Sequence, residues 1–176
     1  MMNELTINTV ETNPVFSNFS INSKGEYAEM EATMPSGSRE TKLHVHPLQT
    51  VQLEAIDGDL GIILPDRRLI IAPGLPYEIP KNTEHAFYNA DEKPVRFKTI
   101  VKPALHIEWM AKEMIASTKR KQSKLMSWIE YSYILNQIKG EYYRSGIPIF
   151  LQKIIHPFLA FFGKILGVDK RIRQVT

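Results

Sequence analysis

Roughly the first 104 residues consist of short runs of extended-chain character, with glycine, proline, asparagine or aspartate in nearly every gap between them. Pairs such as Asp57-Gly58 and Pro73-Gly74 are strong turn signals. The predicted strands cover residues 5–10, 15–21, 26–34, 42–46, 51–56, 60–64, 69–72, 77–79, 85–89 and 95–101. Many short strands without an intervening helix predict a mainly β fold, an antiparallel sandwich or barrel.

The hydrophobic period changes from two to that of a helix after Ala104. Helices are predicted over residues 107–117, 125–138 and 149–166. Lys119 to Ser123 and Arg144 to Pro148 separate them. We therefore expect a β-barrel domain over residues 1–104 and a helical extension over residues 105–176, packed outside the barrel and without a role in the chemistry.

The predicted last helix has an apolar arc that is wider than one packing contact needs. The arc comprises Phe150, Leu151, Ile154, Ile155, Phe158, Leu159, Phe161, Phe162, Ile165 and Leu166. The remaining stripe comprises Gln152, Lys153, His156, Ala160, Gly163 and Lys164. We expect burial of the arc against the barrel and a second subunit, in a homodimer. The alternative is peripheral contact of this helix with a membrane surface.

The composition limits the chemistry. A chain of 176 residues with 43% apolar residues is sufficient for one core. The sequence has no cysteine, which excludes disulfides, thiolate ligands and cysteine nucleophiles and fits a reducing compartment. The first residues, Met1 to Leu5, lack the pattern of a secretory signal, so we expect a cytoplasmic protein.

The net charge of +3 is unevenly distributed along the chain. Residues 1–104 hold 10 Lys and Arg against 14 Asp and Glu, whereas residues 105–176 hold 12 against 5. The basic residues are spread over separate helices and form no known nucleic-acid-reading motif. We therefore expect no nucleic-acid partner.

Three histidines form the most informative pattern. His44 and His46 are two residues apart on a predicted strand, so their side chains point to the same side. His85 belongs to another predicted strand and can reach the same space. Three neutral imidazoles are ligands for a divalent transition metal, with iron, zinc, nickel, manganese and copper as candidates.

The spacing around these histidines resembles the two sequence motifs of the cupin superfamily. The second motif is kept at every interval by Gly74, Pro80, Asn82, His85 and Asn89. Asparagine replaces the family's glycine at position 82, a mild change because asparagine tolerates a positive φ. The first motif is matched by His44, His46 and Gly58, whereas Gly37 stands one residue too far from His44. The resemblance covers roughly residues 25–104.

The chain departs from the family at the glutamate ligand of the first motif. The corresponding position is Val51, or Thr50 when the shorter spacing is counted, and neither can act as a carboxylate ligand. Strand alternation favours Val51 as the inward residue, together with Leu53 and Ala55. Gln49 can approach an open metal position or lie in a solvated loop.

The resemblance implies a double-stranded β-helix, or jelly-roll, barrel that binds a metal through His44, His46 and His85 and a small molecule at its mouth. Sites with three histidines resemble those of the iron(II)-dependent thiol, gentisate and diketone dioxygenases. An O₂-dependent oxidation of a small organic molecule is therefore the most concrete enzymatic hypothesis.

A non-catalytic or metal-free cupin that binds a hydrophobic molecule against Val51, Leu53, Ala55 and Phe87 is the competing hypothesis. In that case the helices serve dimerisation or association with a membrane surface. Asn89 is interpreted as a turn residue under either hypothesis. His106 and His156 receive no ligand role.

Overall fold

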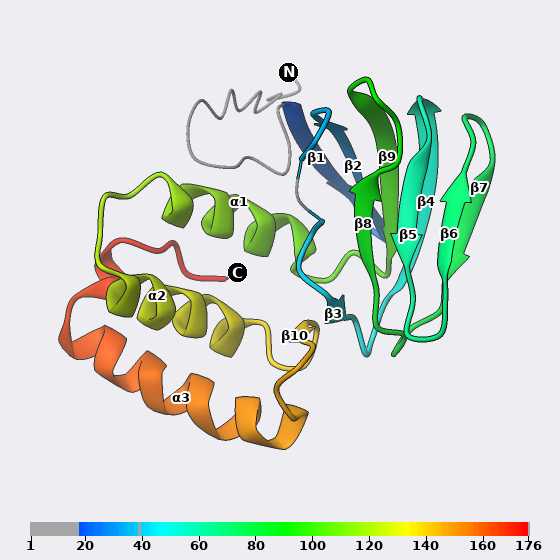
Figure 1. The fold of residues 1–176 in the computed structure, drawn as a ribbon. Helices are drawn as coiled ribbons and strands as arrows, with labels where there is room; N and C mark the ends of the chain where they lie inside the picture. Colours follow the sequence, from blue (N-terminus) through cyan, green and yellow to red (C-terminus); the bar gives the residue numbers. More distant parts are fainter. Residues whose placement is uncertain (1–17, 39, 176) are drawn as a thin grey trace.

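The computed structural model describes residues 18–38 and 40–175. The predicted strand at residues 5–10 lies outside this part of the chain, and the one at 15–21 lies partly outside it. The described chain is rich in antiparallel strands up to Lys102, after which three α-helices follow, as the sequence predicts (Figure 1). No helix occurs among the described residues between 40 and 100.

The first sheet has the strand order β1-β2-β9-β4-β7, with all neighbours antiparallel. Its strands are β1 (Asn18–Lys24), β2 (Tyr27–Met34), β9 (Val95–Lys102), β4 (Thr50–Asp57) and β7 (Pro76–Ile79). Val51, Leu53 and Ala55 of β4 are buried, which confirms the face that strand alternation predicts. Val51 of this face lines the pocket described below.

The second sheet lies opposite the first (Figure 1). It has the order β6-β5-β8, from β6 (Arg68–Ile71), β5 (Leu60–Ile63) and β8 (Ala86–Asn89). An antiparallel bridge between His44 and His85 places the short strand β3 (His44–Val45) beside the start of β8. The strand β10 (Tyr143–Arg144) then pairs with β3. The sequence does not predict β10, which comes from the region between two helices.

The turn before His85 has the backbone geometry that the motif requires. Asn82 has a φ of 64°, the left-handed conformation expected for the residue that replaces glycine. Its backbone N–H donates to the carbonyl oxygen of His46 at 2.9 Å. The turn therefore joins the two segments that carry the histidines.

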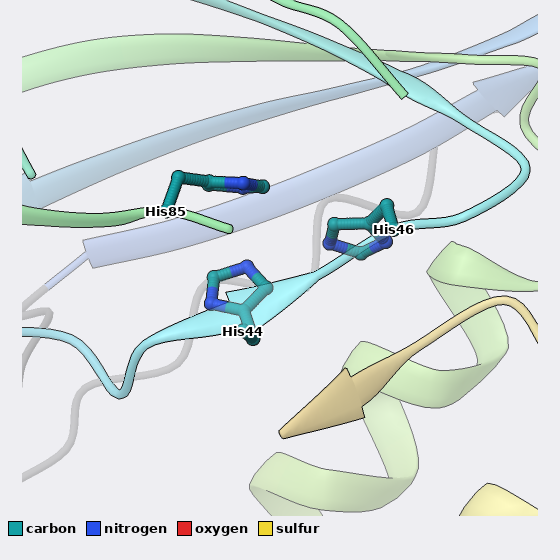
Figure 2. Close-up of side chains that lie close together, drawn as sticks. All are labelled: His44, His46 and His85. Atoms are coloured by element: carbon teal, nitrogen blue, oxygen red, sulfur yellow. The ribbon is translucent and has the colours of Figure 1, made fainter. Parts of the chain in front are cut away.

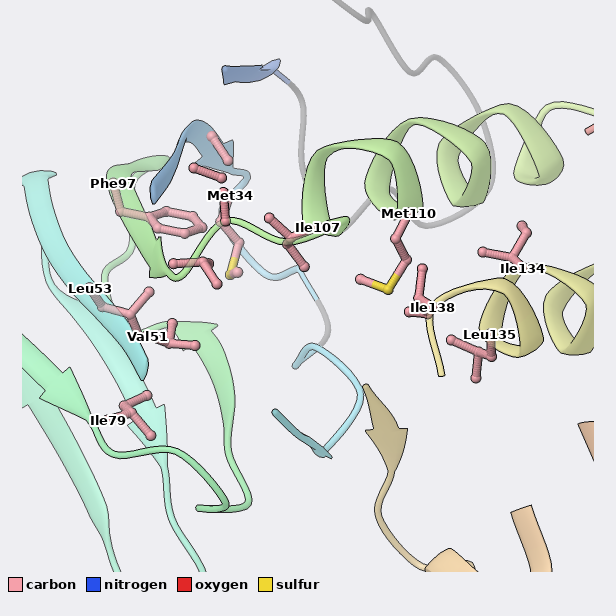
Figure 3. Packing of buried hydrophobic residues seen from close by; sticks show 14 of the residues in the cluster. Met34, Val51, Leu53, Ile79, Phe97, Ile107, Met110, Ile134, Leu135 and Ile138 are labelled. Atoms are coloured by element: carbon pink, nitrogen blue, oxygen red, sulfur yellow. The ribbon is translucent and has the colours of Figure 1, made fainter. Parts of the chain in front are cut away.

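The helices are α1 (Ile107–Thr118), α2 (Lys124–Gln137) and α3 (Ile149–Ile165), followed by the 3-10 turn η1 (Val168–Lys170). Ile107 and Met110 of α1 lie between the residues inside the sheets and those of α2, such as Ile134 and Ile138 (Figure 3). These side chains belong to one continuous cluster of buried residues. The change from strands to helices falls at the predicted boundary, while a division into two domains at residue 104 stays a prediction.

The orientation of α3 corrects the expectation that its apolar arc packs on the barrel. The buried residues of α3 are the small and polar ones, Gln152, His156, Ala160 and Gly163, and they face α2. A Cβ on Gly163 would lie 3.1 Å from the Cγ2 atom of Ile129, so glycine permits the close approach of the two helices. Most of the apolar arc is consequently exposed in the single chain, and only Ile155 and Leu159 of the arc are half-buried.

Candidate metal centre

Two strands and a turn bring the three histidines together (Figure 2). His44 and His85 exchange both backbone hydrogen bonds, at 3.0 and 2.8 Å, so their side chains start from directly opposite positions. His46 follows β3, and its carbonyl is tied to the turn at Asn82. The three imidazoles offer one nitrogen each, and these nitrogens all lie within 4.8 Å of one another.

Each imidazole has its Nδ1 atom bound to an oxygen acceptor. His44 donates to the carbonyl of Lys42 at 2.7 Å, and His85 donates to that of Thr83 at 2.9 Å. The Nδ1 atom of His46 lies 3.1 Å from Gln49 Oε1 and 3.2 Å from the carbonyl of Glu141. Because all four partners are acceptors, the proton of each ring is on Nδ1. The Nε2 lone pairs are therefore free to bind a cation.

Gln49 has a role that differs from both sequence interpretations. Its side chain is buried, and its Nε2 atom donates to the carbonyls of Pro103 and Ala104 at 3.0 and 3.1 Å. These two bonds fix the amide so that Oε1 faces His46. Gln49 is thus neither solvated nor directed at an open metal position, but orients an imidazole, as residues that surround metal ligands commonly do.

The histidines are held in the neutral form that metal binding requires. Burial, together with the neighbouring His85 and His46, holds the pKa of His44 well below its ordinary value. Burial and the proximity of His85 lower the pKa of His46 from 6.5 to about 4. Burial also lowers the pKa of His85. At neutral pH the three rings therefore carry no charge of their own.

The donor set fits a divalent transition metal. Imidazole nitrogen is a preferred ligand of zinc, iron, nickel and copper. The Nε2 atom of His85 is buried and, within the described part of the chain, has no hydrogen-bond partner. A buried polar atom without a partner is costly, and a cation among the three rings would satisfy it. His44, His46 and His85 are the residues that would hold the ion.

A pocket of about 220 Å³ opens beside the histidines. Its walls come from both sheets and from α1, and they are apolar apart from the histidines, Thr99 and Tyr142. The other lining residues are Met30, Ala32, Val51, Phe87, Phe97, Val101, Ile107, Met110, Ala111, Met114 and Ile115. Val51 therefore lies at the site, as the motif predicts for the position of the missing glutamate.

The helical extension also contributes to the site, contrary to the expectation for residues 105–176. The ring of Tyr142 stacks on His44, with centroids 5.0 Å apart and planes inclined by 19°. The carbonyl of Glu141 accepts from His46, and the carboxylate of Glu141 binds the backbone N–H of His106 at 2.9 Å. These residues connect the start of α1 with the metal centre. Glu141 and Tyr142 do not belong to a sequence motif. The run Tyr142-Tyr143-Arg144 is too short to predict a strand.

The other polar residues singled out in the sequence have structural roles. Asn89 accepts from the N–H of Asp91 at 2.7 Å and donates to the carbonyls of Met34 and Lys93, which confirms its interpretation as a turn residue. His156 lies 3.1 Å from the hydroxyl of Ser132, between α2 and α3. His106 pairs with Glu141. Neither histidine joins the three at the centre.

The lowered pKa of His46 predicts an acid-sensitive protein when metal is removed. Above pH 6.5 the ring is neutral in both states; as the pH falls from 6.5 towards about 4, the unfolded chain takes up the proton and the folded chain resists it. Stability is therefore lost over this window, by about 2 kcal/mol between pH 6.5 and 5 from His46 alone. Urea unfolding of chelator-treated protein at pH 7 and pH 5 measures this. The difference in the free energy of unfolding between pH 7 and pH 5 should be smaller in His46→Gln. Equal free energies of unfolding at the two pH values in the native sequence would contradict the prediction.

Known structures are similar to this chain over about half of its length. An uncharacterized conserved protein with a double-stranded β-helix domain from Klebsiella pneumoniae matches at 17% identity and a TM-score of 0.48, over 56% of this chain and 80% of that one. KdgF from Halomonas sp. matches at 14% identity and 0.46, over 53% and 85% of the two chains. A sugar phosphate isomerase from a cupin superfamily, from Silicibacter pomeroyi, matches at 17% identity and 0.43, over 49% of this chain.

The last of these matches covers 60% of the Silicibacter chain, less than two thirds of that protein. A scan against protein-family models finds no match, and a search of curated proteins finds none either. The neighbours are cupin and double-stranded β-helix proteins. A similar fold does not establish a similar activity, so the chemistry of this chain follows from its own residues.

Proposed function

We propose that this protein binds one divalent transition metal ion through the Nε2 atoms of His44, His46 and His85 and acts on a small, largely apolar molecule in the adjoining pocket. The observation that carries the proposal is the common orientation of the three imidazoles. Each is fixed through Nδ1 to an oxygen acceptor, which leaves Nε2 free, and one nitrogen of each ring lies within 4.8 Å of those of the other two. A set of hydrogen-bonded core histidines would not need all three free nitrogens to converge.

The pocket supports a substrate with an apolar body and one polar end. Phe87, Phe97 and Met110 are among the side chains that would contact the body. The polar end would lie towards the histidines, because the rest of the lining is apolar apart from Thr99 and Tyr142. Burial raises the pKa of Tyr142, so its hydroxyl stays protonated, and it is hydrogen-bonded to Tyr131. The ring of Tyr142, stacked on His44, is therefore the part of this residue that is offered to a substrate.

The lack of a carboxylate or lysine side chain among the described lining residues supports oxidation over proton-transfer chemistry. Among the described residues that line the pocket there is no aspartate, glutamate or lysine. When bound, the metal ion supplies Lewis acidity and, if it is iron(II), redox chemistry with O₂. The chain's own contribution is to hold three neutral ligands, exclude bulk water with α1 and Tyr142, and orient the substrate. An O₂-dependent oxidation of a small organic molecule is therefore the activity that we propose.

Metal content tests the proposal directly. Protein purified without a histidine tag should contain close to one transition metal ion per chain by elemental analysis, or take up one in a titration of the chelator-treated protein with iron(II), zinc, nickel or manganese. With three protein ligands we expect retention to be weaker than at a four-ligand site. A folded protein that neither contains nor takes up any of these ions would refute the proposal.

A metal-free binding module is the second candidate, and the apolar lining is the observation that favours it. Val51 stands where the family has a carboxylate ligand, and it lies in the wall of a pocket formed mainly by apolar side chains. A hydrophobic molecule would then be bound by burial of apolar surface alone. Binding of a fluorescent apolar probe that is unaffected by chelation would support this candidate, whereas dependence on metal would support the first.

A further inference from the structure

The outer side of α3 is an unusually large exposed apolar surface, which we call the α3 face and define as Phe150, Ile154, Phe158, Phe161, Phe162 and Ile165. The exposed fractions of Phe150, Phe158 and Ile165 are 68%, 62% and 67%. The ring of Phe162 is in contact with those of Phe158 and Phe161, with centroids 4.9 and 5.7 Å apart. A continuous surface of this kind marks an interaction site in a soluble domain.

The helix cannot bury this face by turning about its axis, because its inner side is held by specific contacts. The side-chain amide of Gln152 donates to the carbonyls of Arg144 and Ile147, both at 2.7 Å, and accepts from the N–H of Arg144 at 3.1 Å. Gly163 is in close contact with Ile129 of α2. Turning the helix would break these bonds and replace the Gly163 contact with Ile129 by a much larger side chain. The apolar residues of the α3 face are therefore exposed because the contacts on the inner side of the helix fix its orientation.

The charged residues of α3 and of the segment before it are all basic. Between Glu141 and Asp169 the sequence contains three basic residues and no acidic residue. Two of the basic residues, Lys153 and Lys164, are exposed on α3 itself. They are eleven residues apart, about three helical turns, and so lie on the same edge of the apolar face. The face needs a partner that is apolar in its interior and negatively charged at its surface.

A second copy of this face does not meet that requirement. Pairing two copies would bury the apolar side chains but would bring lysines together without a carboxylate on either helix. An anionic lipid bilayer supplies both properties, because acyl chains accept the apolar side chains and phosphate groups pair with the lysines. No helix in the described residues is long and apolar enough to cross a membrane. The 17 residues of α3, about 25 Å in length, would therefore lie in the plane of the interface.

We propose that the α3 face docks on the surface of an anionic membrane, with Lys153 and Lys164 at the level of the lipid headgroups. The sheets and the metal centre would then be held beside the bilayer by α2 and α3, without insertion of the barrel. This inference is independent of the metal centre, since none of its residues lines the pocket beside the histidines.

Vesicle flotation of the full chain tests the proposal. The protein should float with vesicles of equimolar phosphatidylcholine and phosphatidylglycerol, and binding should be weaker to phosphatidylcholine alone and in high salt. The double variant Ile154→Glu, Phe158→Glu should lose about tenfold or more in affinity, because it removes buried apolar area and adds negative charge. The variant Lys153→Gln, Lys164→Gln should lose the preference for anionic lipid.

The matched control is Ile70→Glu, Leu75→Glu, which alters two equally exposed apolar residues at the far side of the sheets and should bind vesicles as the native protein does. Light scattering in the absence of lipid addresses the competing partner. A dimer that Ile154→Glu, Phe158→Glu converts to monomer, with no flotation of the native protein, would overturn the proposal in favour of a second copy. Flotation of both double-glutamate variants alike would also overturn it, because binding would then not depend on α3.

Discussion

The double variant His44→Ala, His46→Ala is expected to lose metal binding, with a fall in affinity of more than about 100-fold. Changes to residues that merely orient metal ligands already cost about 10- to 100-fold, and this variant removes two of three ligands. His85 alone would remain of the group of three, with its Nε2 atom buried, and no other group of three possible ligands is found in the part of the chain that the structure describes. Isothermal titration of chelator-treated protein with zinc measures the loss.

The variant His156→Gln is the matched control, because it removes a buried histidine that lies between α2 and α3, outside the metal centre. It should retain the metal affinity of the native protein. Circular dichroism establishes whether each variant is folded before its affinity is compared. Stoichiometric metal that survives in a folded His44→Ala, His46→Ala protein would show that the ion is bound elsewhere.

The strands of this chain were predictable because turn chemistry separates them. Asp57-Gly58, Pro73-Gly74 and the turn at Asn82 lie where the chain reverses, and the inward face of β4 follows from simple alternation. The strand β10 was not predictable, because two residues carry no period. It exists because β3 offers a free edge to the segment that follows α2, which is a tertiary effect.

The buried side of α3 was also mispredicted, for a physical reason that its sequence contains. A rule that places apolar residues inside predicts that the phenylalanines pack against the barrel and a second subunit. The structure instead places Ala160 and Gly163 against α2, since small residues allow close helix contact, and Gln152 is acceptable inside because its amide is fully hydrogen-bonded. Where an apolar arc is very wide, the smallest and best-bonded residues identify the packed side better than hydrophobicity does.

The motif spacing predicted the three histidines of the site, but it did not predict the residues that contact and orient them. Gln49 is near His46 in sequence, but its fixed orientation depends on the carbonyls of Pro103 and Ala104, more than fifty residues away. Tyr142 and Glu141 reach the centre only because β10 pairs with β3. Residues that orient ligands through main-chain carbonyls leave no signal in a single sequence.

Restoring the carboxylate with Val51→Glu is expected to tighten metal binding by about tenfold or more, the second large effect. Val51 is buried in β4 and lines the same pocket as the three histidines, so a glutamate there would be directed at the centre. A charged ligand adds attraction to the cation in a site of low dielectric constant. Without metal the same carboxylate would be buried without a partner. We therefore expect the metal-free variant to be less stable by several kcal/mol and the metal to restore most of this loss.

The control for this variant is Val51→Gln, which has the same size and shape as glutamate but carries no charge. It separates the effect of added volume from that of the carboxylate, because crowding of the pocket should destabilise both variants, whereas only Val51→Glu should bind metal more tightly. Zinc titration and thermal unfolding, each with and without metal, provide the comparison. If a folded Val51→Glu protein binds zinc no more tightly than the native one, then residue 51 does not face the metal, and the fourth position of this centre is open to a ligand that is not from β4.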